Sequence, residues 1–146
     1  MHNLNTLVGY NLRRASQLLM AALAEPLAEL GLRVTEATVL VVLQSAPMSS
    51  QSDMCRTLSI KGANMTPLIA GLIARGLVKR TSSSGRVHPL KLTAKGEALA
   101  MRARNVMNEH DDAYFGALSI GERDWLNHFF SSVWRNPGGA TDEGGD

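Results

Sequence analysis

The order of short elements predicted between residues 49 and 92 constrains the fold more than any other feature of the chain. Two short helical segments, about 50–58 and 62–75, are separated by a tight turn. A polar run, 81–85, then separates two strand patterns, 77–80 and 87–92. Two helices joined by a tight turn and followed by a hairpin predict a winged helix-turn-helix.

Longer helical patterns precede this region. Apolar residues recur at three- and four-residue steps from Leu4 to about Leu30, which predicts one long helix that Pro26 is expected to kink. A second helix, capped by Thr35, is apolar around most of its circumference. We therefore expect the second helix to be central and largely buried.

The C-terminal part is also predicted to be helical. Thr93 is a suitable cap for a helix that ends near Phe115, and Ser119 opens a last helix. The glycine-rich, acidic tail 136–146 has little to bury and is expected to be disordered. At 146 residues, the chain is ample for one core and short for two. The expected organisation is one mainly α domain over 1–135, with dimerisation helices at about 1–31 and 97–135 and a winged helix with a two-stranded wing at about 34–96.

Basic residues are concentrated in one part of the chain. Residues 56–104 hold ten of the fifteen Lys and Arg residues but only one of the thirteen acids, Glu97. The formal charge of this segment is therefore +9, against −7 for the remainder. Such segregation is typical of a surface that binds a polyanion such as DNA, although a merely solvated basic face has the same composition.

Signals for other classes of protein are weak. The sequence has no glycine-rich phosphate loop, HExxH pair or GxSxG elbow, so neither an enzyme nor a cofactor is expected. His110 with Asp111 or Asp112 offers at most a weak metal site across a dimer. No stretch approaches the roughly 20 apolar residues of a membrane span and no signal peptide is evident, which predicts a cytoplasmic protein. The single cysteine, Cys55, is either a buried small residue or a lone redox thiol.

The flanking helices are apolar on more than one face. Stripes around Leu4, Leu7 and Val8, and around Phe129 and Val133, would leave a large apolar patch on a monomer. A two-fold homodimer is therefore expected. Two recognition helices related by a dyad can enter successive major grooves about one helical turn apart.

Residues 34–99 resemble the winged helix-turn-helix of the MarR family of bacterial transcriptional regulators. The most specific parts are the helix-to-strand junction LIARGLVKR at 72–80 and the hairpin exit LTAKG at 92–96. The segment GYNLRRAS, 9–16, also resembles the first helix of the family. The resemblance implies a homodimer that binds double-stranded DNA at a palindromic operator, represses or activates a neighbouring promoter, with repression the favoured role, and is released by a small ligand or an oxidant. A winged helix used for protein contacts is the alternative, which the segregated charge disfavours.

Candidate DNA contacts follow from the pattern and the resemblance together. Polar side chains at the start of the first short helix suit a phosphate, or serve only as caps. Asn64 can pair with adenine, and the small groups beside it can meet a thymine methyl. Arg86 matches the wing arginine that the family inserts into the minor groove. The expected DNA-binding residues are Ser49, Ser50, Gln51, Lys61, Ala63, Asn64, Thr66, Pro67, Lys79, Arg80, Ser83 and Arg86.

The chain departs from the family pattern at two positions, one beside Arg86 and one at Pro67. Relatives usually carry an aspartate two residues before the wing arginine, where this chain has Ser84, so Arg86 is expected to be more mobile. Pro67 stands where many relatives have a basic residue. The run Thr-Pro-Leu there resembles the hydroperoxide-sensing branch, but that branch has its reactive cysteine near the start of the first helix. Cys55 instead falls in the first short helix, which favours a structural thiol over a peroxide sensor.

Ligand control rests mainly on the resemblance. The family's pocket lies between the first, second and fifth helices, where polar side chains can orient a carboxylate or a phenol. The candidate effector is therefore a small molecule such as an aromatic carboxylate. The candidate ligand-binding residues are Tyr10, Arg13, Arg14, Gln17 and His110, each of which also suits a surface or interface position.

Overall fold

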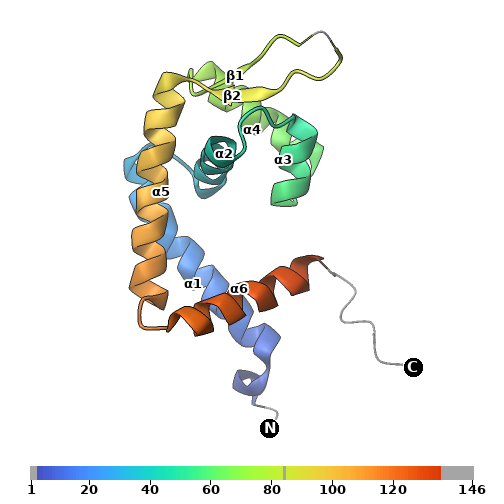
Figure 1. Ribbon diagram of the computed structural model, residues 1–146. Coiled ribbons are helices and arrows are strands. Elements are labelled where there is room, and N and C mark those ends of the chain that lie inside the picture. The colour runs from blue at the N-terminus through green and yellow to red at the C-terminus, as the bar shows by residue number, and fades with distance from the viewer. Residues whose placement is uncertain (1–2, 84, 136–146) are drawn as a thin grey trace, which may run out of the picture. The chain divides into compact units, whose positions relative to one another are not determined.

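The computed structural model describes residues 3–83 and 85–135, and Figure 1 labels its helices and strands. These residues fall into two compact units divided between His110 and Asp111. The fold is mainly helical with a two-stranded antiparallel sheet, as predicted. The predicted disordered tail lies outside the described residues. The elements are a 3-10 turn Leu4–Thr6, α1 Val8–Glu29, α2 Val34–Ser45, α3 Gln51–Leu58, α4 Gly62–Ala74, β1 Val78–Arg80, β2 Leu90–Leu92, α5 Ala94–Phe115 and α6 Ile120–Arg135.

The N-terminal segment differs from the single helix that was predicted. Leu4–Thr6 form a 3-10 turn, and Leu7 is extended before α1 begins at Val8. Apolar spacing could not reveal this break, because Leu4 and Val8 keep a four-residue step across it. Pro26 lies inside α1, which continues to Glu29.

The start of α2 also differs from the prediction. The helix begins at Val34, before the expected cap Thr35, and its N-cap is Arg33. The carboxylate of Glu36 accepts the backbone N–H of Arg33 at 2.8 Å and thereby satisfies one donor at the helix start. Glu36 is buried and lies 3.5 Å from the guanidinium of Arg75, which also donates to the Gly31 carbonyl. A carboxylate, rather than a hydroxyl, therefore fixes this helix end.

The core of the first unit surrounds α2, as its apolar circumference predicted. The unit buries apolar side chains from α2, α3, α4, the sheet and α5, which is the main source of its stability. The largest fully buried side chains are Leu27, Val39, Leu40, Leu43, Met54, Met65, Ile69, Leu72, Leu77, Val78 and Leu90.

The wing is attached to the residues that precede α3. In the sheet, Val78 pairs with Leu92 and Arg80 with Leu90. The returning strand begins at Leu90 rather than at the predicted residue 87, because Pro89 has no N–H to donate. Leu90 also exchanges backbone hydrogen bonds with Met48 and Ser49, at 3.1 and 2.9 Å. The position of the wing therefore fixes the start of α3.

Close packing joins the wing to α5. The Thr93 hydroxyl accepts the Gly96 N–H at 3.0 Å, which confirms Thr93 as the cap of α5. A Cβ atom on Gly96 would lie 1.9 Å from the carbonyl oxygen of Leu77. Only glycine allows the backbone of α5 to approach β1 so closely.

The second unit contains the end of α5 and the whole of α6. Ser119 opens α6 as predicted: its hydroxyl accepts the Glu122 N–H, and the Glu122 carboxylate accepts the Ser119 N–H. No residue from 111 to 135 is buried. Across the described parts of both units, no helix is long and apolar enough to cross a membrane.

Candidate nucleic-acid interface

Gln51 connects three elements of the candidate DNA-binding surface. Its side-chain oxygen accepts from the guanidinium of Arg80 on β1 at 2.9 Å, and its amide nitrogen donates to the Thr66 hydroxyl on α4 at 2.9 Å. Gln51 itself is the first residue of α3. The three residues, which we call the Gln51 bridge, therefore join the wing, α3 and α4 into one polar surface.

The serines before α3 are engaged in local hydrogen bonds. Ser50 is the N-cap, and its hydroxyl accepts the Asp53 N–H at 3.1 Å while donating to the Asp53 carboxylate. The Ser50 hydroxyl, its backbone N–H and the nearby Arg56 hold the pKa of Asp53 below its usual range. The Ser49 hydroxyl donates to the Ala46 carbonyl at 2.7 Å. The phosphate contacts predicted for both serines remain predictions.

The outer face of α4 carries the predicted base-contacting residues. Met65, Ile69 and Leu72 of this helix face the core. The remaining residues near its start are exposed, namely Lys61, Ala63, Asn64, Thr66 and Pro67. This division leaves a polar and small-residue surface free for a groove, as predicted for a recognition helix.

The wing brings a second arginine close to the Gln51 bridge. Arg80 and Arg86 help to line a shallow cavity of about 300 Å³ between the wing and the start of α3. Among residues 3–83 and 85–135, Arg86 makes no hydrogen bond or ion pair, and the predicted DNA contact Ser83 donates to the Val87 carbonyl. The family position of the missing aspartate, Ser84, lies outside the described residues.

A cation pair on the sheet was not recognised from the sequence. Lys79 and Lys91 stand directly opposite each other on the two strands, and both side chains are exposed. Like charges opposite each other destabilise a hairpin unless an anion lies nearby. The sequence identified Lys79 as a DNA contact but not Lys91, because only the strand register reveals the pair.

Several basic residues stabilise the fold instead of forming a free basic surface. Arg104 on α5 donates to Gln44, to the Ser45 hydroxyl and to the Val41 carbonyl, at 3.0, 2.7 and 3.2 Å. These contacts join α5 to the last turn of α2. Arg75 pairs with buried Glu36, as described above. Composition therefore overstates the number of cations that are available to DNA.

Cys55 is half-buried and packs against the core of the first unit. It lies in the middle of α3, and the structural role that the sequence favoured remains a prediction. The thiol is less deeply buried than expected.

The candidate effector residues lie on α1 and α5. The guanidinium groups of Arg13 and Arg14 lie 5.6 and 5.7 Å from the centre of the Tyr10 ring, which brings three of the five residues together. Gln17 is exposed on α1. His110 is half-buried on α5. Two cations on one aromatic ring form an arrangement that can receive an anionic group.

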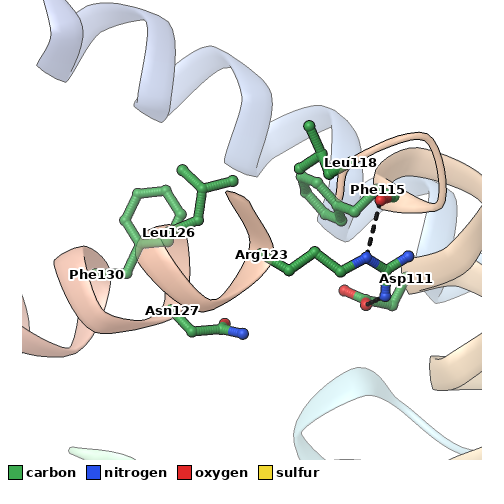
Figure 2. Close-up of a pocket in the computed structure, with 7 residues that line it drawn as sticks. All are labelled: Asp111, Phe115, Leu118, Arg123, Leu126, Asn127 and Phe130. Carbon is green, nitrogen blue, oxygen red and sulfur yellow. Dashed lines mark hydrogen bonds and ion pairs between the residues drawn. The ribbon is translucent and has the colours of Figure 1, made fainter. Parts of the chain in front are cut away.

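The second unit contains a pocket of about 280 Å³ that the sequence did not predict (Figure 2). Its floor carries Arg123, whose guanidinium donates to the Phe115 carbonyl at 3.0 Å and pairs with Asp111 and Asp112 at 3.6 and 3.1 Å. The two carboxylates neutralise this cation, so it offers little attraction to an anion. Within the described chain, no group of three or more His, Cys, Asp or Glu side chains could hold a metal ion. The lining residues are Asp111, Phe115, Leu118, Arg123, Leu126, Asn127 and Phe130.

The winged helix-turn-helix agrees with comparisons to known proteins. The model of the MarR family matches residues 30–86. The HTH-type transcriptional repressor Rv2887 of Mycobacterium tuberculosis is 35% identical over 118 residues, which cover 80% of this chain and 85% of that repressor. The chain belongs to the MarR family. As a MarR-family protein it is a DNA-binding transcriptional regulator, and its relatives are regulators rather than enzymes.

Solved structures of MarR-family proteins share the fold. The transcriptional repressor CouR bound to a 23-mer DNA duplex is 31% identical, with a TM-score of 0.81 over 91% of this chain and 96% of CouR. CouR bound to p-coumaroyl-CoA is 31% identical, with a TM-score of 0.79 over 92% and 96%. Rv2887 in complex with salicylic acid is 29% identical, with a TM-score of 0.68 over 87% and 96%.

Proposed function

We propose that this MarR-family protein is a homodimeric repressor that binds a palindromic operator and is released by a small aromatic acid or its thioester. The Gln51 bridge carries the DNA-binding part of the proposal. It holds the wing and the recognition helix in one fixed arrangement before DNA arrives, so little ordering entropy is lost on binding.

The DNA-binding residues have distinct proposed roles. Asn64 and its neighbours on α4 contact base edges, whereas Lys61, Lys79 and Ser49 to Gln51 contact phosphates. Arg86 inserts into the minor groove beside the cavity that it shares with Arg80. The opposed Lys79 and Lys91 are relieved of their repulsion when a phosphate approaches.

Exposed apolar side chains support the homodimer. In the N-terminal segment Leu7 and Val8 are 55% and 71% exposed, and in α6 Trp125 and Val133 are 63% and 48% exposed. Burying such side chains against a second copy stabilises the assembly. A dyad then pairs two recognition helices, which turns a weak half-site into a specific palindrome.

The effector proposal rests on α1 and on the relatives. Tyr10 with Arg13 and Arg14 can orient a carboxylate or a phenol, and the structures of CouR and Rv2887 contain p-coumaroyl-CoA and salicylic acid. The dimer has two states, and only one of them spaces its recognition helices correctly for DNA. The ligand releases DNA because its binding free energy favours the other state by several kcal/mol.

Fluorescence anisotropy tests the proposal with DNA from immediately upstream of the gene, at two salt concentrations. We expect tight binding that weakens steeply with salt, since each neutralised phosphate releases counterion. Salicylate or p-coumaroyl-CoA is expected to release the DNA, and the double variant Arg13→Gln, Arg14→Gln should resist release. Arg102→Gln is the matched control, because Arg102 is exposed on α5 outside both candidate sites.

Two results would favour the alternatives. Absence of DNA binding at low salt would support a winged helix that binds another protein. Release by hydrogen peroxide alone, abolished by Cys55→Ser, would make Cys55 the sensor.

A further inference from the structure

The hydrogen bonds of the Gln51 bridge can run in only one direction. A guanidinium has no acceptor, so the side-chain oxygen of Gln51 must face Arg80, 2.9 Å away. The amide nitrogen of Gln51 must then face Thr66, and it can only donate. The oxygen of Thr66 therefore accepts, and its single proton goes to the Gly62 carbonyl at 3.0 Å. The charge on Arg80 thus fixes the role of a hydroxyl on another helix.

The direction of these hydrogen bonds determines which groups of Thr66 can contact DNA. Its only hydroxyl proton is used inside the protein, and one of its two lone pairs is taken by Gln51. Thr66 is nevertheless exposed on the outer face of α4. The parts of the side chain that the bridge does not engage are the γ-methyl group, which can make only apolar contacts, and one lone pair of the hydroxyl, which can only accept.

The surface beside Thr66 is also apolar. Ala63 and Pro67 are exposed, and Ala63 lies three residues before Thr66 and four before Pro67, so it adjoins both of them on the surface of α4. Pro67 carries no N–H and three ring methylene groups, so it cannot donate to a base. The only apolar group on the major-groove edges of the four bases is the C5-methyl of thymine.

We propose that Thr66 recognises a thymine by an apolar contact between its γ-methyl group and the thymine methyl, and that Ala63 and Pro67 complete this contact. Gln51 is the positioning residue, because its hydrogen bond occupies the Thr66 hydroxyl and leaves the methyl group for the base. The proposal rests on the proposed DNA-binding function and names the base that this part of the surface selects. Thr66 is thus a specificity residue whose hydroxyl forms hydrogen bonds within the protein and whose methyl group contacts the DNA.

Deoxyuridine tests the DNA side, because it differs from thymidine only by the C5-methyl group. The probe is a duplex selected from a random library by repeated binding to the wild-type protein, with each thymine replaced in turn by deoxyuridine. At one thymine position per half-site we expect a loss of about fourfold in affinity, the usual contribution of one buried methylene-sized group. Replacement at both half-sites should cost roughly fifteenfold.

Two conservative variants test the protein side. Thr66→Val keeps a methyl in place and loses the hydroxyl, so it should retain the thymine-over-uracil ratio. Thr66→Ser keeps the hydroxyl and loses the methyl, so its ratio should fall to about one. Combining each variant with each duplex forms a double-mutant cycle that isolates the methyl–methyl contact. The melting temperature of each variant verifies that it folds.

Gln51→Leu tests the positioning role. The substitution removes both hydrogen bonds of the bridge and leaves Thr66 held only by its bond to the Gly62 carbonyl, so its hydroxyl becomes available to DNA and the thymine-over-uracil ratio should fall. A merely structural role would weaken binding to both duplexes equally and leave that ratio unchanged.

Different results would contradict the DNA-binding proposal and the thymine contact. If the wild-type protein selects no duplex and binds none in a salt-dependent way, the DNA-binding proposal fails. If it binds tightly but no deoxyuridine substitution weakens binding, or if Thr66→Ser keeps the preference that Thr66→Val loses, the methyl contact is wrong and the hydroxyl reads the base.

Discussion

The first unit surrounds a buried apolar core and exposes large apolar side chains mainly in its N-terminal segment and α1, whereas the second unit leaves its apolar side chains exposed or half-buried. Every buried residue of the described chain lies in the first unit, between Leu27 and Ala103. In α6 no residue is buried, and Trp125 and Phe129 stack on each other at 5.4 Å on the surface. The first unit is therefore stabilised by its own core, while the second gains most from covering by another surface.

The two units also use their polar groups differently. In the first, Gln51 and Arg104 each tie together separate parts of the fold, namely the wing to α4 and α5 to α2. In the second, Arg123 joins only neighbouring parts of one helical hairpin. Substitutions around the core and the Gln51 bridge of the first unit should therefore alter folding and DNA binding, whereas substitutions in α6 and in the N-terminal segment with Leu7 and Val8 should alter association.

The largest effect is expected at the contact between α5 and β1. Gly96→Ala places a Cβ atom 1.9 Å from the Leu77 carbonyl oxygen and should lower the free energy of unfolding by about 3 kcal/mol or more. Gly71→Ala is the matched control, because its Cβ would meet nothing within 4 Å and should stabilise α4 by about 0.5–1 kcal/mol. Urea unfolding monitored by circular dichroism measures both. Equal stabilities would mean that α5 and β1 do not pack as described.

Removal of exposed apolar groups from α6 should weaken association by at least about thirtyfold, which corresponds to about 2 kcal/mol per dimer. The double variant Phe129→Ser, Val133→Ser makes this change, and Asn127→Ser in the same helix is the control. Sedimentation velocity over a range of concentrations gives the dissociation constant. Dimers as strong as those of the wild type would place the interface on other residues.

Arg104→Ala should destabilise the first unit by about 2 kcal/mol, because three acceptors at the end of α2 lose a charged donor. Arg102→Ala, on the same helix and exposed, should have almost no effect. Thermal unfolding of the two variants compares them directly. If both variants lost equally little stability, the acceptors at the end of α2 would be hydrogen-bonded by groups other than Arg104.

Arg86→Ala should weaken DNA binding by about 1 kcal/mol for most sequences and reduce the salt dependence by about one counterion per protomer. Arg80→Ala should also change the thymine-over-uracil ratio at the Thr66 position, because Arg80 orients Gln51. Anisotropy titrations with both duplexes separate the two arginines. If Arg86→Ala also lowered the thymine-over-uracil ratio, the wing tip would influence the Gln51 bridge, and the separation of the two arginines would be wrong.

The smallest effects concern the serine-capped helix starts, one in each unit. Hydrogen bonds from Ser50 and Ser119 lower the pKa values of Asp53 and Glu122 in the folded protein. A carboxyl with a lowered pKa stabilises the fold above its unfolded pKa, and this stabilisation is lost as the pH falls through the folded pKa. Asp53→Asn should therefore lose slightly less stability than the wild type between about pH 6 and pH 3. Asp124→Asn is the control, and an identical pH dependence in all three proteins would contradict the role of the cap.

The sequence predicted the elements whose signals are local. Caps such as Ser50, Thr93 and Ser119 and the turn at Gly76 depend on chemistry within a few residues, so the helix order and the hairpin were predicted correctly. The start of α2 was wrong, because a glutamate one turn into the helix supplied the capping interaction that was assigned to Thr35.

The sequence could not predict contacts between distant segments. Gln51 was recognised as a polar residue at a helix start, but its two partners lie 15 and 29 residues away. The basic segment was counted correctly, yet only tertiary structure shows that Arg75 and Arg104 bind the protein itself. The Lys79–Lys91 pair likewise depends on strand register, which composition does not contain.

The backbone pairing of Met48 and Ser49 with Leu90 has a consequence for sequence variation. Both hydrogen bonds use main-chain atoms, so the side chains at 48 and 49 can change without altering where α3 begins. The limit is conformational: Met48 has φ of 69°, which glycine or asparagine adopts readily and a β-branched residue does not. Related chains can therefore carry different side chains at positions 48 and 49 while the wing keeps its position relative to α3 and α4.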